Sequence, residues 1–146
     1  MLLFSCNQGR IYSDRIELPD MVWDMNKIVK FEVPVENASL DYNLKVELRT
    51  VDFYQFKNLY LFIRTVSPSG VEAADTLECI LYDDKGNPLS DNKMRFGELE
   101  DYEFMFKEKV KFAESGVYTF YLQHGMRQEQ LPYVKEVGLI VEKTNE

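Results

Sequence analysis

The sequence predicts an all-β protein, an antiparallel two-sheet β-sandwich of about 7–9 strands, either jelly-roll or immunoglobulin-like. Apolar residues recur at every second position along several short segments, as in strands that bury one face. Turn-forming residues separate these segments, and none of them carries an apolar stripe over three helical turns. With 146 residues, of which 45% are hydrophobic and 14% aromatic, the chain can bury a core of its own.

The first strands are predicted in the segments 29–35, 42–49 and 59–63. In VKFEVPV (29–35), valine and phenylalanine alternate with Lys30, Glu32 and Pro34. Because proline cannot donate a hydrogen bond to a neighbouring strand, we expect this strand at a sheet edge or bent. The segment 59–63 is apolar on both faces, which favours a central strand.

Four further strands follow, separated by turns. Pro68, Gly70 and the run DDKGNP supply the residues that turns require. The apolar spacing of 91–102 is irregular and allows one turn of helix at most. We expect strands at 76–83, 101–112, 117–124 and 136–143, with turns at 67–70, 83–88 and 114–116.

The N-terminus carries a short apolar stretch that ends at Cys6. In LFSC (3–6), an apolar residue stands three before the cysteine and a small residue directly before it, as in a bacterial lipobox. We therefore expect residues 1–5 to be the remnant of a lipoprotein signal peptide and Cys6 to carry the lipid. Residues 6–20 are expected to form a tether or a loose first strand, and 21–146 a single β-sandwich domain.

Charge and residue counts exclude several classes of function. Lys and Arg total 17 against 25 Asp and Glu, a net charge of −8, so the clustered positive charge of nucleic-acid binding is missing. No stretch approaches the ~18 apolar residues of a membrane-spanning helix. Two cysteines and one histidine do not provide the ligand set of a structural zinc site, and we expect no metal and no cofactor.

The residue types suited to catalysis occur without the neighbours that catalysis needs. Cys79 is expected to be a small buried apolar residue, because Glu78 beside it disfavours a reactive thiolate. His124 ends a strand without a nucleophile motif nearby, which favours a structural role. Asp83 and Asp84 fit a hairpin turn better than a calcium loop. A hydrolase with paired carboxylates remains a minor alternative, and we expect no enzymatic activity.

Abundant aromatic residues leave a second function open, namely binding of carbohydrate on an exposed sheet face or at loop tips. We expect most of these rings in the core, whereas two coplanar exposed rings beside polar groups would favour sugar binding. Trp23 precedes the predicted strands and can pack as a lid. The candidate rings are Tyr54, Phe56, Tyr60, Tyr102, Tyr118 and Tyr121.

An ordered set of motifs over 18–143 resembles the gliding motility-associated lipoprotein family GldH. The motifs are LPDMVWDMNKIVKFEVP, DTLECILYDDKGNPLS, FKEKVKFAESGVYTFYLQHGMR and LPYVKEVGLIVEK. The resemblance also covers Gln123, His124, Met126 and Arg127, which together with Trp23 are our candidate interaction residues. Tyr133 stands where the family pattern has a small residue, so we expect a different local geometry there.

The resemblance implies a lipidated cell-envelope protein with a β-rich domain and a part in an apparatus for gliding and associated protein export. It implies no catalytic residues, and it assigns a chemical role only to Cys6, as the site of lipidation. The expected partners are a membrane, through the lipid, and other envelope proteins. Residues 7–10 lack the acidic run associated with surface display, which favours a domain facing the periplasm.

Overall fold

Alternating apolar residues form ten β-strands in the computed structural model, which describes residues 9–90 and 99–144. A short 3₁₀ turn, η1 (Pro19–Met21), links the first two strands. The strands are β1 (Arg10–Glu17), β2 (Val22–Asp24), β3 (Val29–Val35), β4 (Tyr42–Val51), β5 (Asn58–Val66), β6 (Glu72–Ile80), β7 (Leu99–Val110), β8 (Gly116–His124), β9 (Gln130–Pro132) and β10 (Val134–Lys143).

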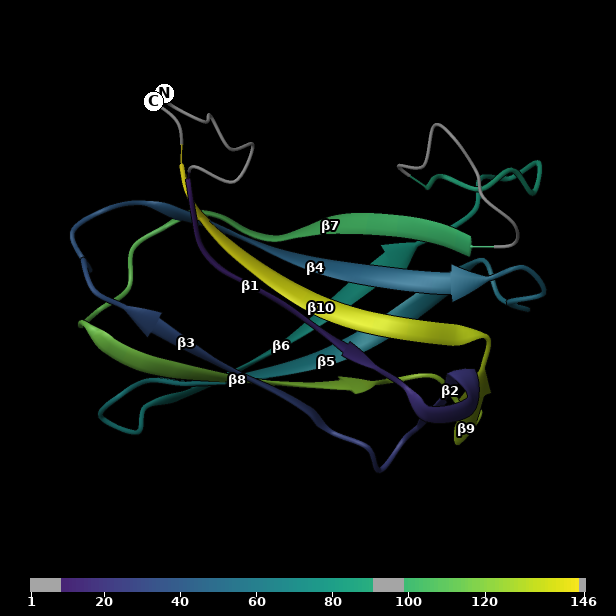
Figure 1. Cartoon of the computed structure of the whole chain (residues 1–146), viewed down its shortest axis with the longest axis horizontal. Helices are drawn as coiled ribbons and strands as arrows, with labels where there is room; N and C mark the ends of the chain where they lie inside the picture. Colours follow the sequence, from purple (N-terminus) through teal and green to yellow (C-terminus); the bar gives the residue numbers. More distant parts are fainter. Residues whose placement is uncertain (1–8, 91–98, 145–146) are drawn as a thin grey trace, which may run out of the picture.

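Eight of these strands form two antiparallel sheets that pack face to face (Figure 1). Sheet 1 has the order β1-β10-β4-β7 and sheet 2 the order β3-β8-β5-β6. The chain alternates between the sheets except at the β5–β6 hairpin, and this order is that of a jelly roll. The structure thus decides between the two predicted sandwich types. A ribbon of β2 and β9 closes one end.

The inward faces of the two sheets make one apolar core. Sheet 2 contributes Phe31, Leu61 and Phe120, and sheet 1 contributes Val46 and Leu139, all essentially inaccessible to solvent. Each comes from an alternating segment, so that its sequence neighbours point outward. The sequence pattern therefore explains which face of each strand is buried.

The predicted edge strand and turns are confirmed. β3 lies at the edge of sheet 2, a position that suits Pro34 because proline has no N–H to donate to a neighbouring strand. The β5–β6 turn contains Gly70 with φ +94°, and the turn after β6 contains Gly86 with φ +82°. Both conformations are readily accessible to glycine.

Three features differ from the prediction. Residues 6–20 were expected to form a tether or a loose first strand, and β1 instead pairs with β10 along its whole length. The short strands β2 and β9 had no alternating pattern to predict them. β5 is central as predicted, but its outer face is exposed rather than buried. Much of the segment 91–102, where a helical turn was allowed, lies outside the described residues, and its end, from Leu99, begins β7.

Tyr133 joins β9 to β10 with a left-handed backbone, at φ +71°. Its N–H donates to the carbonyl of Met21 and its carbonyl accepts from the N–H of Val51, so the conformation is held from two sides. A small residue, glycine above all, adopts this conformation with less strain.

Candidate functional site

The structure divides the five candidate interaction residues into a buried pair and a group that lies nearer the surface. Trp23 of β2 and His124 at the end of β8 are fully buried. Their rings meet edge to face, with centroids 5.6 Å apart and planes at 71°. The indole N–H donates to the carbonyl of Lys27 at 2.9 Å. Trp23 is therefore part of the core rather than a surface contact residue.

Both ring nitrogens of His124 are used within the fold. The N–H of Met126 donates to Nδ1 at 3.2 Å, and Nε2 lies 3.3 Å from the carbonyl oxygen of Glu129. Because Nδ1 accepts, Nε2 carries the proton of the neutral ring. Burial lowers the pKa of His124 below its ordinary value, whereas hydrogen bonds to the backbone of Glu129 and Trp23 and the charge of Asp24 act in the opposite direction. This histidine shapes the loop after β8 and has no access to a substrate.

Gln123, Met126 and Arg127 lie nearer the surface. The side-chain amide of Gln123 donates to the carbonyl of Met25 at 2.6 Å. The sulfur of Met126 lies 3.4 Å from the backbone nitrogen of Tyr60, which fixes this side chain against β5. Arg127 is exposed, and within residues 9–90 and 99–144 it has no ion-pair partner.

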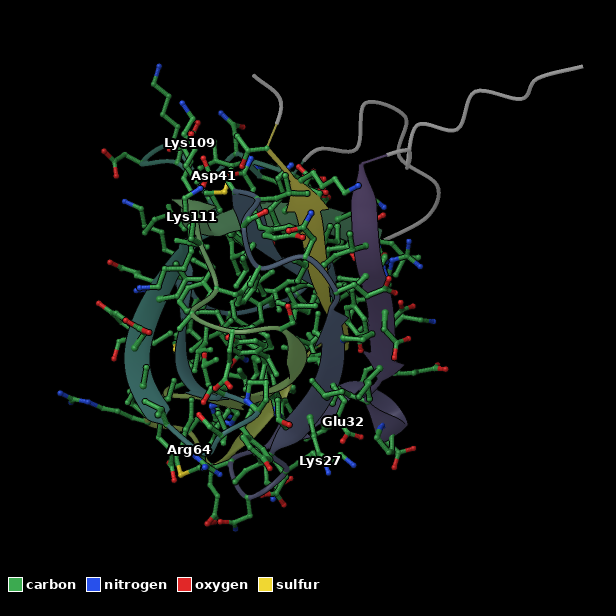
Figure 2. The ribbon with its side chains drawn as sticks, turned by 90° about the vertical axis from the view of Figure 1, so that its left-hand side faces the viewer. Lys27, Glu32, Asp41, Arg64, Lys109 and Lys111 are labelled. Atoms are coloured by element: carbon green, nitrogen blue, oxygen red, sulfur yellow. The ribbon has the colours of Figure 1, made fainter. Side chains whose placement is uncertain are left out.

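The outer face of sheet 2 exposes aromatic side chains along β5. Tyr60 is 37% and Phe62 49% exposed, and Arg64 follows two residues later on the same face. The guanidinium of Arg64 lies 4.2 Å from the ring centroid of Tyr121 and forms an ion pair with Glu72 at 3.1 Å. Figure 2 shows Arg64 on the side of the sandwich away from β1. The outer face of sheet 2 thus carries exposed aromatic rings next to an arginine whose charge is already paired.

Two hollows lie on either side of the Phe62–Gly125 contact. The Phe62 hollow, of about 390 Å³, is lined mainly by Ile28, Phe62, Arg64, Thr76, Tyr121 and Gln123. The Met126 hollow, of about 270 Å³, is lined by Phe56, Tyr60, Gly125, Met126, Arg127 and Gln128. The candidate residues other than the buried pair therefore line these two hollows.

The outer face of sheet 1 is instead closed by ion pairs. Arg15 binds Glu47 through two hydrogen bonds, of 2.8 and 3.2 Å, and also contacts Glu136. Arg49 joins Glu136 to Asp101, and a second set runs from Lys45 to Glu103 and Glu142. These charged side chains pair with one another across all four strands, so this face leaves few unpaired charged groups for a ligand to bind.

The aromatic residues singled out from sequence fall into three groups. Tyr54, Tyr102 and Tyr118 are buried, as expected of core rings, and Phe56 and Tyr121 are half-buried. Tyr60 is exposed, and Phe62 beside it was missed. The sequence could have predicted the exposure of Phe62. Tyr60, Phe62 and Arg64 stand at alternate positions of one strand, and the arginine indicates that their shared face is exposed to solvent.

The other candidates agree with structural roles. Cys79 is buried in β6, and burial together with the charge of Glu78 raises the pKa of its thiol to about 12. Asp83 accepts hydrogen bonds from the backbone of Lys85 and Asn87, as in a turn. No group of three potential metal ligands occurs in the described part of the chain, which also contains no helix able to cross a membrane. Cys6 lies outside the described residues.

Comparisons with known proteins agree on one family. A family model described as GldH lipoprotein matches residues 10–141. The gliding motility lipoprotein GldH of Flavobacterium johnsoniae is 30% identical over 150 residues, covering 98% of this chain and 91% of the relative. A GldH homolog of Christiangramia forsetii is 28% identical, covering 99% and 91%.

Among solved structures, TmCBM61 in complex with β-1,4-galactotriose covers 97% of both chains, with 12% sequence identity and a TM-score of 0.34. This overlap is too low to support an argument. The family model spans nearly the whole sandwich, from the first residue of β1 to residue 141 in β10. The chain belongs to the GldH lipoprotein family.

Proposed function

We propose that this protein is anchored in the cell envelope by a lipid on Cys6 and that its jelly roll serves as a non-enzymatic interaction module of a motility or export assembly. The observation that carries the proposal is membership of a lipoprotein family in a chain whose LFSC motif ends at the required cysteine. The thiol of Cys6 would carry a diacylglycerol, and palmitate is a suitable acyl label for it.

Chain geometry is compatible with such an anchor. Cys6 precedes the first residue of β1 by only a few positions, and β1 is the edge strand of sheet 1. A lipid there would hold the sandwich close to the membrane surface, with the end of sheet 1 nearest to it. Two acyl chains bind a bilayer far more firmly than one.

The interaction role draws on the surface of the domain. Sheet 1 is closed by ion pairs, while sheet 2 exposes Tyr60 and Phe62 beside two hollows. The buried state of His124 and Cys79 leaves neither as a catalytic base or nucleophile. We infer that the domain works by binding, from a periplasm-facing position.

The test expresses the native gene in its host with radiolabelled palmitate and separates membranes from soluble protein. We expect label and membrane association in the wild type, and loss of both in Cys6→Ser. The matched control is Cys79→Ala, which removes the buried cysteine and should leave label and fractionation unchanged. A Cys6→Ser protein that remains labelled and membrane-bound would refute the anchor.

A further inference from the structure

We propose that the outer face of sheet 2 binds a β-linked oligosaccharide, with sugar rings stacked on Phe62 and beside Tyr60. This site rests on the proposed interaction role of the domain but not on the lipid at Cys6. Four properties of the face support this ligand: an exposed ring held in place, paired charges around that ring, a fixed amide, and two adjoining hollows.

The ring of Phe62 is both exposed and positioned. It is 49% accessible, yet it packs directly over Gly125, where an added Cβ would stand 2.8 Å from the ring. The N–H of Gly125 donates to the carbonyl of Tyr60 at 2.7 Å, which ties the loop after β8 to β5. An aromatic surface fixed before binding costs little entropy when a ligand stacks on it.

The charged groups around this ring are already paired. Arg64 is held by Glu72 and by the ring of Tyr121, and Asp75 accepts from Lys107 at 3.2 Å. A strongly charged ligand would have to compete with these partners. The surroundings of Phe62 therefore suit a neutral ligand that has both apolar and hydroxyl surfaces. In the Met126 hollow, the guanidinium of Arg127, which has no ion-pair partner among the described residues, can donate hydrogen bonds to hydroxyl groups.

Hydrogen-bonding groups line the Phe62 hollow beside the ring. The amide nitrogen of Gln123 donates to the carbonyl of Met25, and this hydrogen bond fixes the orientation of the amide group and of its oxygen. Among the described residues, no donor is paired with that oxygen, and the hydroxyl of the exposed Thr76 lies in the same hollow. Sugar hydroxyls can satisfy both groups, while the apolar C–H face of the sugar ring stacks on Phe62.

The ligand is a chain rather than a single sugar, because the face has two hollows. Phe62 lines one of them and its contact residue Gly125 lines the other, so the two adjoin. Hollows of about 390 and 270 Å³ are each of the size of one or two sugar rings. Pyranose rings with equatorial hydroxyls have the flat C–H faces that stacking requires, and equatorial β-linkages join such rings into an extended chain that can reach both hollows.

The test titrates cellohexaose, laminarihexaose and chitohexaose into the purified, ¹⁵N-labelled full chain and follows amide shifts by NMR. We expect at least one sugar to bind with a dissociation constant of about 0.01–1 mM. The shifts should cluster on β5, on β8 and at Gly125. Absence of binding by all three sugars would overturn the proposal.

Three variants locate the site. Phe62→Ala should weaken binding about tenfold or more, since it removes the stacking surface. Gly125→Ala should also weaken it, because its methyl group displaces the ring without removing it. Phe53→Ala is the matched control: this ring is 71% exposed and lines neither hollow, so affinity should not change. Thermal melts establish that each variant is folded.

Sedimentation velocity tests the other possible occupant of this face, a second copy of the chain. If Phe62→Ala converts a dimer into a monomer and no sugar binds, the face is a self-association surface and the proposal is wrong. The two proposals also fail separately. Membrane anchoring without sugar binding refutes only this inference, and sugar binding by a protein that carries no lipid refutes only the anchor.

Discussion

The indole of Trp23 and the imidazole of His124 meet edge to face inside the domain, with ring centroids 5.6 Å apart. This contact joins the β2–β9 ribbon to the end of β8, and the hydrogen bonds of His124 hold the loop that follows. That loop contains Gly125, which supports the exposed ring of Phe62. A buried ring pair thus positions the proposed binding surface without belonging to it.

Stability should fall as His124 becomes protonated. Burial lowers the pKa of this imidazole in the folded protein, so below the ordinary value of about 6.5 the unfolded chain takes up the proton more readily. The contribution is present above that pH and is lost as pH falls through it. We expect the free energy of unfolding, measured by urea denaturation, to decrease between pH 7 and 5.

His124→Gln is the control for this pH dependence. Glutamine keeps a donor and an acceptor but does not titrate. The variant should be less stable at pH 7 and show a shallower decrease toward pH 5. Parallel curves for wild type and variant would assign the effect to carboxylates instead.

The thiol of Cys79 should be unreactive in the folded protein. Its burial in β6 and the neighbouring charge of Glu78 raise its pKa to about 12, so almost no thiolate exists at pH 8. In the Cys6→Ser chain, a chromogenic disulfide reagent at pH 8 should label no thiol before urea is added and one thiol afterwards. Rapid labelling of the native chain would show that β6 opens readily.

The alternating segments predicted the fold well because each buries one face. Phe31 and Leu48 lie in the core as the period of two requires, and Pro34 identified an edge strand. The short strands β2 and β9 were not predictable, since three residues carry no periodicity. β1 was expected only as a tether or a loose strand, because as an edge strand it buries little: Ile11, Tyr12 and Ile16 pack against the core only partly.

The candidate site was predicted less well, for a different reason. Gln123, Met126 and Arg127 were selected as a motif, and they do line the two hollows. The ring beside them, Phe62, belongs to a different strand and lies 61 positions before Gln123 in the sequence. Pairing of β5 with β8 brings Phe62 opposite Gln123. Such a juxtaposition depends on strand order, which local patterns do not encode.

Substitution of Gly138 should destabilise sheet 1. In the middle of β10, an added Cβ would stand 2.8 Å from the carbonyl oxygen of Asp14 and 2.9 Å from Cγ of Arg15. The first contact is with backbone, which cannot move without disturbing the β1–β10 pairing. We expect Gly138→Ala to lower the free energy of unfolding by about 1–3 kcal/mol.

Gly9→Ala is the matched control for this crowding effect. Its added Cβ would stand 3.6 Å from the nearest heavy atom, the carbonyl oxygen of Lys143, which is ordinary van der Waals contact. The same chemical change should therefore alter stability little. Equal losses in the two variants would exclude close packing at Gly138 as the cause.

Glycine at position 109 should stabilise the domain, in contrast to its usual effect in strands. Lys109 is exposed near the end of β7, close to Asp41 and Lys111 (Figure 2), and its backbone is left-handed at φ +53°. The register of β7 against β4 shifts in this region, and the N–H of Lys109 donates to the side chain of Asn43 at 2.9 Å. The unusual backbone is thus held by its surroundings at a cost to the lysine.

Lys109→Gly removes that cost and keeps the backbone hydrogen bond to Asn43, so we expect the free energy of unfolding to rise by about 0.5–1 kcal/mol. Its neighbour Glu108 is exposed and has no positive φ. Glu108→Gly should therefore lower the free energy of unfolding by about 0.5–1 kcal/mol, because glycine only adds freedom to the unfolded chain there. Urea denaturation of both variants gives the two signs. A loss of stability in both would mean that the left-handed conformation at Lys109 carries no strain.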